Sequence, residues 1–167
     1  MDEFSFPISG RGGARDARGE EIEDPLPLVR ALLSISKSTR AFLALLLADI
    51  GLHLGQDQLI ACLRDGEPMS VSTLADRIAV RPSTVSKMLD RLVEKGAVRR
   101  LVSAEDARRT MVLLTEEGAA LKPRVAQVWA RLESELAGGM SADEARAVKE
   151  AMARIDLLLA ARLRRHR

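Results

Sequence analysis

A helical pattern that breaks and restarts within a short segment constrains this chain most. The segment SVSTLADRIAVRPSTVSKMLDRLVEKGAVRR contains two helix signals, with the sequence AVRP between them. Ser70 is suited to cap the first helix, which should extend to about Ile78. Pro82 suits the first turn of the second helix, where its missing N–H costs nothing. That helix should run to about Lys95 and end at Gly96, so the segment predicts two short helices joined by a tight turn.

Two short apolar segments follow these helices. Residues 98–102 and 110–114 are rich in β-branched or aliphatic side chains, and the polar sequence SAEDARR separates them. This pattern predicts the two strands of a hairpin. Two short helices followed by a basic hairpin are the layout of a winged helix-turn-helix, in which the small Ala75 suits a close helix crossing. The expected shared core consists of Leu74, Ile78, Val85, Met88, Leu89 and Leu92.

A long helix is expected before this region. Apolar or small side chains recur at alternating steps of four and three residues from Leu28 to Ile50. This spacing places them on one face of a helix that starts at Pro25 and ends near Gly51 or Gly55.

Three further helices complete the pattern. One covers about residues 56–64 and stops at the turn sequence DGEP. Thr115 and Ser141 are suited to cap the last two helices, which the sequence GGMS separates. The chain is therefore predicted to be mostly α-helical with a small β-hairpin wing.

Charge and composition narrow the function classes. The formal net charge of the 167 residues is only +2, but residues 70–110 carry nine basic and five acidic side chains, a net charge of +4. The single cysteine, Cys62, excludes an intrachain disulfide and fits a reducing cytosol. We expect no membrane span, because no apolar run reaches roughly 18 residues. The sequence contains no Gly-rich phosphate loop, no paired His and Cys and no nucleophile elbow, so we expect neither an enzyme nor a cofactor. His53 has no second His or Cys at metal-ligand spacing, so we expect no metal site.

The second short helix carries the expected contacts to DNA. Hydroxyl groups near a helix N-terminus, with cations behind them, can bind phosphates and base edges in a major groove. The alternative is an ordinary helical hairpin with a solvated charged face. The candidate residues are Ser83, Thr84, Ser86, Lys87 and Arg91.

The tip of the hairpin is the second expected contact. Arg108 and Arg109 are placed to reach a minor groove, where narrow geometry concentrates negative potential. Asp106 is spaced to hold the Arg108 guanidinium through a bidentate pair. A surface salt bridge of little energetic value is the alternative.

The run from Met69 to Leu121 resembles the MarR family of bacterial transcriptional regulators. The sequences STVSKMLDRLVEKGAVRR and EDARRTMVLLTEEGAAL carry the resemblance, which helix order extends to roughly residues 25–165. It implies a two-fold dimer whose recognition helices enter successive major grooves of double-stranded DNA at a pseudo-palindrome. It also implies that the wing arginine, here Arg108 with Asp106 as its orienting partner, enters a minor groove.

Two positions depart from the pattern of that family. Arg81 precedes Pro82 at a position where Ser or Asn is more usual. Because Arg81 cannot cap the helix, we expect it to add a phosphate contact. Ala79 stands where the inter-helix turn often has Gly, and it should be tolerated if it keeps a negative φ.

The resemblance also assigns roles along the chain. It implies a dimerisation helix within 25–55, a DNA-binding winged helix-turn-helix over 56–115 and dimerisation helices over 116–167. Residues 1–24 are rich in Gly and charged residues without periodicity, so we expect a flexible tail there. Apolar stripes on the first, fifth and sixth helices support a homodimer, because one chain of this size would not cover them. Packing of the three helices within a single chain is the alternative.

The resemblance further suggests a small aromatic or phenolic effector, bound between the dimer helices and the winged domain. Phe42, His53, Cys62 and Trp129 lie on or near the helices expected to line that crevice. Absence of any effector is an open alternative, and Cys62 is better explained as a buried structural thiol than as a sensor.

The sequence therefore predicts a cytoplasmic, sequence-specific transcriptional regulator that acts as a dimeric repressor released by a small molecule. The alternative is a winged-helix module that binds a partner protein without specific DNA binding.

Overall fold

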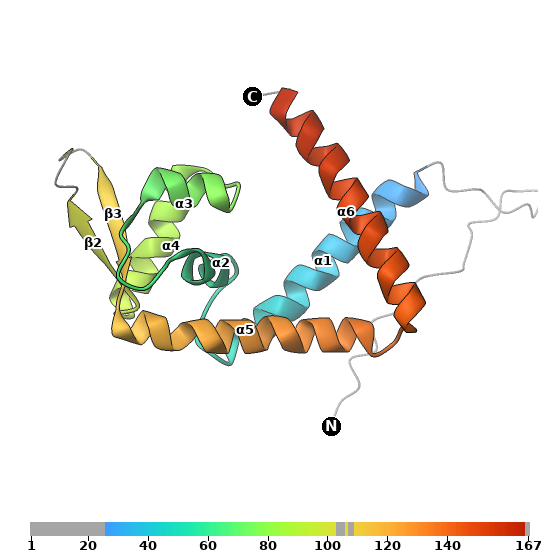
Figure 1. The fold of residues 1–167 in the computed structure, drawn as a ribbon, viewed down its shortest axis with the longest axis horizontal. Coiled ribbons are helices and arrows are strands. Elements are labelled where there is room, and N and C mark those ends of the chain that lie inside the picture. The colour runs from blue at the N-terminus through green and yellow to red at the C-terminus, as the bar shows by residue number, and fades with distance from the viewer. Residues whose placement is uncertain (1–25, 103–105, 107–108, 166–167) are drawn as a thin grey trace, which may run out of the picture. The chain divides into compact units, whose positions relative to one another are not determined.

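The computed structural model describes residues 26–102, 106 and 109–165, and it confirms a mostly helical fold with a small sheet (Figure 1). Contacts divide the chain into two units, Met1–Thr39 and Arg40–Arg167. The elements in chain order are α1 (Pro27–Ala48), α2 (Gln56–Cys62), β1 (Met69–Ser70), α3 (Val71–Arg77), α4 (Pro82–Glu94), β2 (Val98–Val102), β3 (Thr110–Leu114), α5 (Glu116–Ala137) and α6 (Ala142–Arg165).

The sheet has three antiparallel strands in the order β1-β3-β2. The predicted hairpin is confirmed, and its register pairs Val98 with Leu114 and Val102 with Thr110. The additional strand β1 pairs Met69 with Val112. Its two residues are too few to show a period-2 pattern, so only the pairing with β3 reveals it.

The predicted helix caps are confirmed by their hydrogen bonds. Ser70 Oγ accepts from the Thr73 amide at 3.1 Å, and Thr115 Oγ1 accepts from the Gly118 amide at 3.0 Å. At α6, Ser141 Oγ accepts from the Glu144 amide at 3.3 Å, and Glu144 Oε2 accepts from the Ser141 amide at 2.8 Å. This reciprocal pair is a capping box, which satisfies two backbone donors at the start of the helix.

The turn between α3 and α4 differs from the expectation for Ala79. Its φ is +54°, so the residue adopts the left-handed conformation rather than a negative φ. The Val80 amide donates to the Ala75 carbonyl at 3.0 Å, and the Ala79 amide donates to the Asp76 carbonyl at 3.3 Å. These bonds form a Schellman motif, which requires a left-handed residue after the helix. Ala79 is therefore strained, because its Cβ disfavours that conformation.

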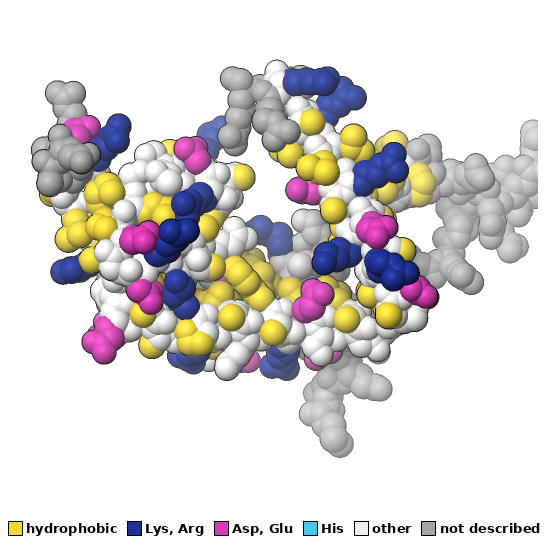
Figure 2. Space-filling view, in the orientation of Figure 1, with side chains coloured by type: hydrophobic (Ala, Val, Ile, Leu, Met, Phe, Trp, Pro, Cys, Tyr) yellow, Lys and Arg dark blue, Asp and Glu magenta, His cyan; other side chains and the backbone are white. Residues whose placement is uncertain are grey.

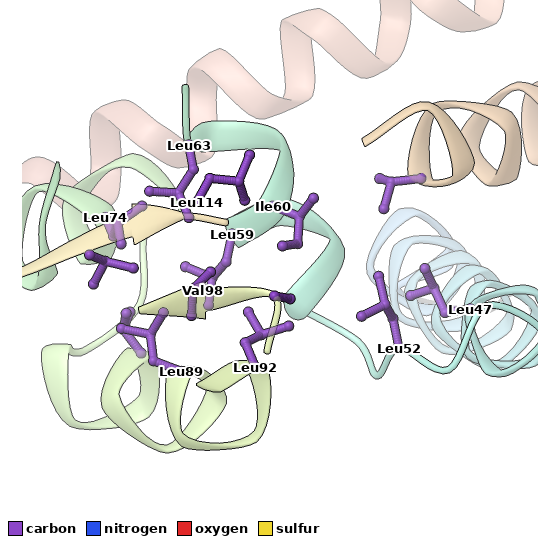
Figure 3. Close-up of a cluster of buried hydrophobic side chains, with 14 of the residues drawn as sticks. Leu47, Leu52, Leu59, Ile60, Leu63, Leu74, Leu89, Leu92, Val98 and Leu114 are labelled. Carbon is purple, nitrogen blue, oxygen red and sulfur yellow. The ribbon is translucent and has the colours of Figure 1, made fainter. Parts of the chain in front are cut away.

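The core lies where the end of α1, α2, α3, α4, the sheet and α5 meet, and Figure 3 shows its side chains converging from several of these elements. Four of the six predicted core residues are fully buried, namely Leu74, Val85, Leu89 and Leu92. Ile78 and Met88 are half-buried and pack against the same cluster. Burying these aliphatic side chains holds α4 in place against the sheet.

The junction between the sheet and α5 is unusually close. The Thr115 amide donates to the Ala97 carbonyl at 3.1 Å, and Thr115 Oγ1 donates to the Gly96 carbonyl at 2.6 Å. A Cβ added at Gly118 would lie 1.9 Å from the Ala97 carbonyl oxygen. Gly118 is therefore required by the approach of the two backbones.

Helix α1 corrects the expectation about membrane-length segments. Its 22 residues include a window of mean hydropathy 1.4, long and apolar enough by composition to cross a membrane. This helix was predicted from the sequence, but that prediction considered only uninterrupted apolar runs and did not identify a membrane-length window in a helix that includes Lys37 and Arg40. A core helix of a soluble protein and a signal sequence pass the same test, and a cation near the centre of a membrane helix costs about 2.5–3.5 kcal/mol.

Candidate nucleic-acid interface

Helix α4 separates its apolar and polar residues onto two faces. Val85, Leu89 and Leu92 are buried, whereas the predicted contacts Ser83, Thr84, Lys87 and Arg91 are exposed and Ser86 is half-buried. Figure 2 shows basic side chains over the region of α3 and α4, with acidic side chains among them. The buried residues orient the helix so that hydroxyl groups and cations face outward.

The start of α4 presents the positive end of its dipole. Arg81 has an extended backbone and makes no side-chain cap, as predicted, and Pro82 occupies the first turn. Arg81, Ser83 and Thr84 are all exposed beside this helix end. The helix dipole favours an anion there, and a guanidinium adds to that preference.

Two cavities lie near these elements, one of about 500 Å³ and a smaller one of about 260 Å³ between the first half of α4 and the tip end of β3. The smaller cavity brings Ser86 of α4 together with Arg109 beside β3. Hydroxyl groups of Ser70 and Thr110 contribute to its wall. The wall is therefore rich in hydrogen-bonding groups of the kind that bind phosphate oxygens.

The wing contains one ion pair among the residues that the structure describes. Arg109 Nε lies 3.4 Å from Asp106 Oδ2, and the Arg109 amide donates to the Asp106 carbonyl at 2.9 Å. Arg108, with its expected pairing to Asp106, lies outside the described residues. The ion pair of Asp106 in the described residues is therefore with Arg109.

Arg100 on β2 was missed as a site residue by the sequence prediction. Its guanidinium Nη2 lies 2.8 Å from Asp90 Oδ1 and donates to the Ser86 carbonyl at 3.1 Å. The alternation of side chains in a strand places Arg100 on the same face as the buried Val98. The sequence signal that could have identified Arg100 is a cation at the strand position that faces α4.

The candidate effector residues do not gather in one place. His53 lines the cavity of about 500 Å³ together with Arg91 and Lys95, beside aliphatic side chains of α1 and the loop that follows it. Cys62 is half-buried against the core, where Phe42 also packs. Neither residue is part of that cavity wall, and Trp129 is not part of it either.

Trp129 has a different set of contacts in α5. Its indole Nε1 donates to Asp57 Oδ2 at 3.0 Å. Asp57 is 1% exposed, and its other carboxylate oxygen accepts from the Gly55 amide at 2.9 Å. Within the described residues, no three His, Cys, Asp or Glu side chains form a group able to hold a metal ion.

Comparison with known proteins matches the region that contains α2 to β2 and the start of β3. The family model described as the MarR family matches residues 52–110. The multiple antibiotic resistance protein MarR of Escherichia coli is 29% identical over 120 residues, which cover 71% of this chain and 83% of that protein. The transcriptional repressor MdtR of Bacillus subtilis is 37% identical over 60 residues, covering 36% of this chain and 39% of that protein.

Solved structures extend the similarity to the helices on either side. The reduced form of MarR from E. coli has a TM-score of 0.69 and 26% identity, covering 79% of this chain and 98% of that one. A MarR variant complexed with operator DNA has the same TM-score, identity and coverage. The family match over residues 52–110 includes α4 and its exposed polar face.

Proposed function

The chain belongs to the MarR family of DNA-binding transcriptional regulators, and on that premise we propose that it is a homodimeric repressor of a pseudo-palindromic operator. A small molecule would release it from that operator. As a regulator rather than an enzyme, it would work in the cytoplasm, where its DNA is.

The observation that carries this proposal is the two-faced helix α4. Its buried leucines and Val85 hold it against the sheet, and its exposed Ser83, Thr84 and Lys87 face outward. Hydroxyl groups and cations at this end of a helix suit contacts to base edges and phosphates in a major groove. We assign to Arg81 a phosphate contact beside the same helix end.

The wing supplies a second contact in this proposal. Arg109 and Arg108 would approach a minor groove next to the half-site read by α4. The pair between Asp106 and Arg109 supports a restrained wing, because an arginine whose position is restrained loses less entropy on binding. Asp106 would orient an arginine rather than contact DNA.

Exposed apolar side chains support a homodimer. They occur on α1, α5 and α6, and a large apolar surface on a soluble domain usually marks an interface. A two-fold dimer would cover the same patch on both chains and place two α4 helices at a fixed spacing. Among the exposed residues are Leu28, Leu33 and Ile35 on α1, Leu136 on α5 and Met152, Leu157, Leu158, Leu159 and Leu163 on α6.

The cavity lined by His53 supports an effector of defined chemistry. Arg91 and Lys95 contribute cations to its wall, and none of the described carboxylates lines it. Aliphatic groups of Ala44, Ala48 and Leu52 complete the wall. This combination suits a small aromatic acid, whose ring would lie on the aliphatic side. The effector would favour dimers whose α4 helices are wrongly spaced for successive grooves.

Fluorescence anisotropy with a duplex from upstream of the protein's own gene tests the proposal. A scrambled duplex is the control, and both are titrated over a salt series near physiological strength. Binding about a thousandfold tighter to the upstream duplex is expected for a specific regulator. Absence of binding to either duplex at every salt concentration would favour the alternative, a module that binds a partner protein.

A further inference from the structure

Among the described residues of β2 and β3, Arg100 is the cation whose side chain contacts α4. Its Nη2 contacts two acceptors on α4, Asp90 Oδ1 at 2.8 Å and the Ser86 carbonyl oxygen at 3.1 Å. These acceptors are four residues apart in the helix, so they lie on the same face one turn apart. The guanidinium therefore bridges strand β2 and one turn of α4.

Pairing of β2 with the central strand β3 fixes the backbone that carries this guanidinium. Arg100 pairs with Val112, which is fully buried in the central strand β3. The neighbouring Arg99 points to the opposite face because side chains alternate along a strand. Arg99 has the same charge, and its guanidinium makes no ion pair among the residues that the structure describes.

We propose that Arg100 is a positioning residue that sets how α4 is presented to DNA, and that it does not itself neutralise a phosphate. This inference rests on the proposed DNA binding by α4. The carboxylate of Asp90 already neutralises the guanidinium, which reduces its attraction for a phosphate. Ser86, whose carbonyl accepts from Arg100, belongs to the predicted DNA-contacting turn, so movement of this turn would displace neighbouring contacts.

Arg100 and Asp90 are also partly exposed, with 39% and 54% of their side chains accessible. An exposed ion pair contributes little to the free energy of unfolding. Its proposed effect is instead on orientation, where a small displacement of α4 weakens contacts to base edges. Contacts to base edges carry sequence specificity, whereas phosphate contacts carry most of the salt dependence.

The test uses the full chain and a duplex selected from a random-sequence library by the unmodified protein, with a scrambled duplex beside it. Arg100→Gln is compared with Arg99→Gln, which removes the same charge from the opposite face of β2. We expect Arg100→Gln to weaken binding to the selected duplex about tenfold more than Arg99→Gln does, equivalent to about 1.4 kcal/mol. Binding to the scrambled duplex should be the same for both variants.

Two further measurements separate positioning from direct contact. The slope of log affinity against log salt should stay unchanged in Arg100→Gln, whereas a lost phosphate contact would lower its magnitude by about 0.9. Removing the acidic side chain in Asp90→Ala should weaken specific binding, although electrostatics alone predicts tighter binding to a polyanion. The double variant should lose no more than Arg100→Gln alone.

Three outcomes would overturn the inference: equal losses in Arg100→Gln and Arg99→Gln, a reduced salt slope, or tighter binding by Asp90→Ala. Equal losses on both duplexes would show a general defect of folding. Failure of the unmodified protein to prefer any selected duplex would instead refute the proposed function, so the two failures are distinguishable.

Discussion

The indole Nε1 of Trp129 donates a hydrogen bond to Asp57 Oδ2 at 3.0 Å, linking α5 to the start of α2 across 72 residues of sequence. Asp57 is almost fully buried, and its other oxygen accepts from the Gly55 amide. The buried carboxylate thus depends on donors from two elements. It also lies at the N-terminus of α2, where the helix dipole favours a negative charge.

Replacing Trp129 by Phe should therefore destabilise the fold. The ring is largely retained, but the buried carboxylate of Asp57 loses a donor, which typically costs about 1–3 kcal/mol. Urea unfolding followed by circular dichroism would measure the change in the free energy of unfolding. In the variant Asp57→Asn, the further change Trp129→Phe should cost less, because no charge is left without a donor. Equal costs in both backgrounds would mean that the indole contributes only by packing.

Adding a single methyl group at Gly118 should be severe. The new Cβ would lie 1.9 Å from the Ala97 carbonyl oxygen and 2.8 Å from Leu114 Cδ1, so α5 must move away from the sheet. We expect Gly118→Ala to cost several kcal/mol, more than the roughly 1–3 kcal/mol typical of overpacking. The matched control is Gly139→Ala, where a Cβ would meet nothing within 4 Å. Similar thermal unfolding of the two variants would contradict the close approach.

The substitution Ala79→Gly should stabilise the protein. A left-handed residue with a Cβ costs about 1–2 kcal/mol, and the extra entropy of glycine in the unfolded chain offsets about 0.5–1 kcal/mol of that gain. A net increase of about 0.5–1 kcal/mol in the free energy of unfolding is expected in urea titrations. Ala126→Gly, within the exposed face of α5, should instead destabilise by about 1 kcal/mol. Destabilisation by both substitutions would argue against the positive φ.

The capping box of α6 predicts a specific pH dependence. The amide of Ser141 and then its hydroxyl donate to Glu144, and these bonds lower the pKa of the Glu144 carboxyl below its ordinary value of 4.5. Because the folded-state pKa is lowered, this contribution to stability is present above the ordinary pKa and is lost as the pH falls through the lowered value. Carboxyl NMR titration would follow the residue directly. In Ser141→Ala the pKa should rise only part of the way back, since the amide still donates, and an unchanged pKa would contradict a role for the hydroxyl.

Arg108→Ala should weaken binding to operator DNA if the wing enters a minor groove. Loss of one phosphate-neutralising charge lowers the salt slope by about 0.9. Anisotropy over a salt series would measure both the affinity and the slope. Arg124→Ala, on the exposed part of α5, removes the same charge from a helix assigned to the dimer. DNA affinity that is unchanged in Arg108→Ala would show that the wing assignment is wrong.

Helix limits and caps were predictable because the interactions that define them are local. Ser70, Thr115 and Ser141 each accept a hydrogen bond from an amide three residues later, so short segments contain the whole interaction. The exposed residues of α4 were predictable for a similar reason, since the 3.6-residue period separates the two faces of a helix. The length of α1 as an apolar segment was misjudged, because charged residues of a helix interrupt an apolar run in the linear sequence even when they lie on another face.

The sequence by itself determined the order of the elements, their ends and the polar face of α4, because each depends on residues within a few positions of one another. Only the tertiary structure decided the partners of Arg100 and Trp129, the strand β1 and the need for Gly118 to lack a side chain. These features join segments that are distant in sequence, and no periodicity within one segment encodes the distance between two others. Ala79 shows both influences: its place after α3 follows from the sequence, but its positive φ follows from the path that the chain takes into α4.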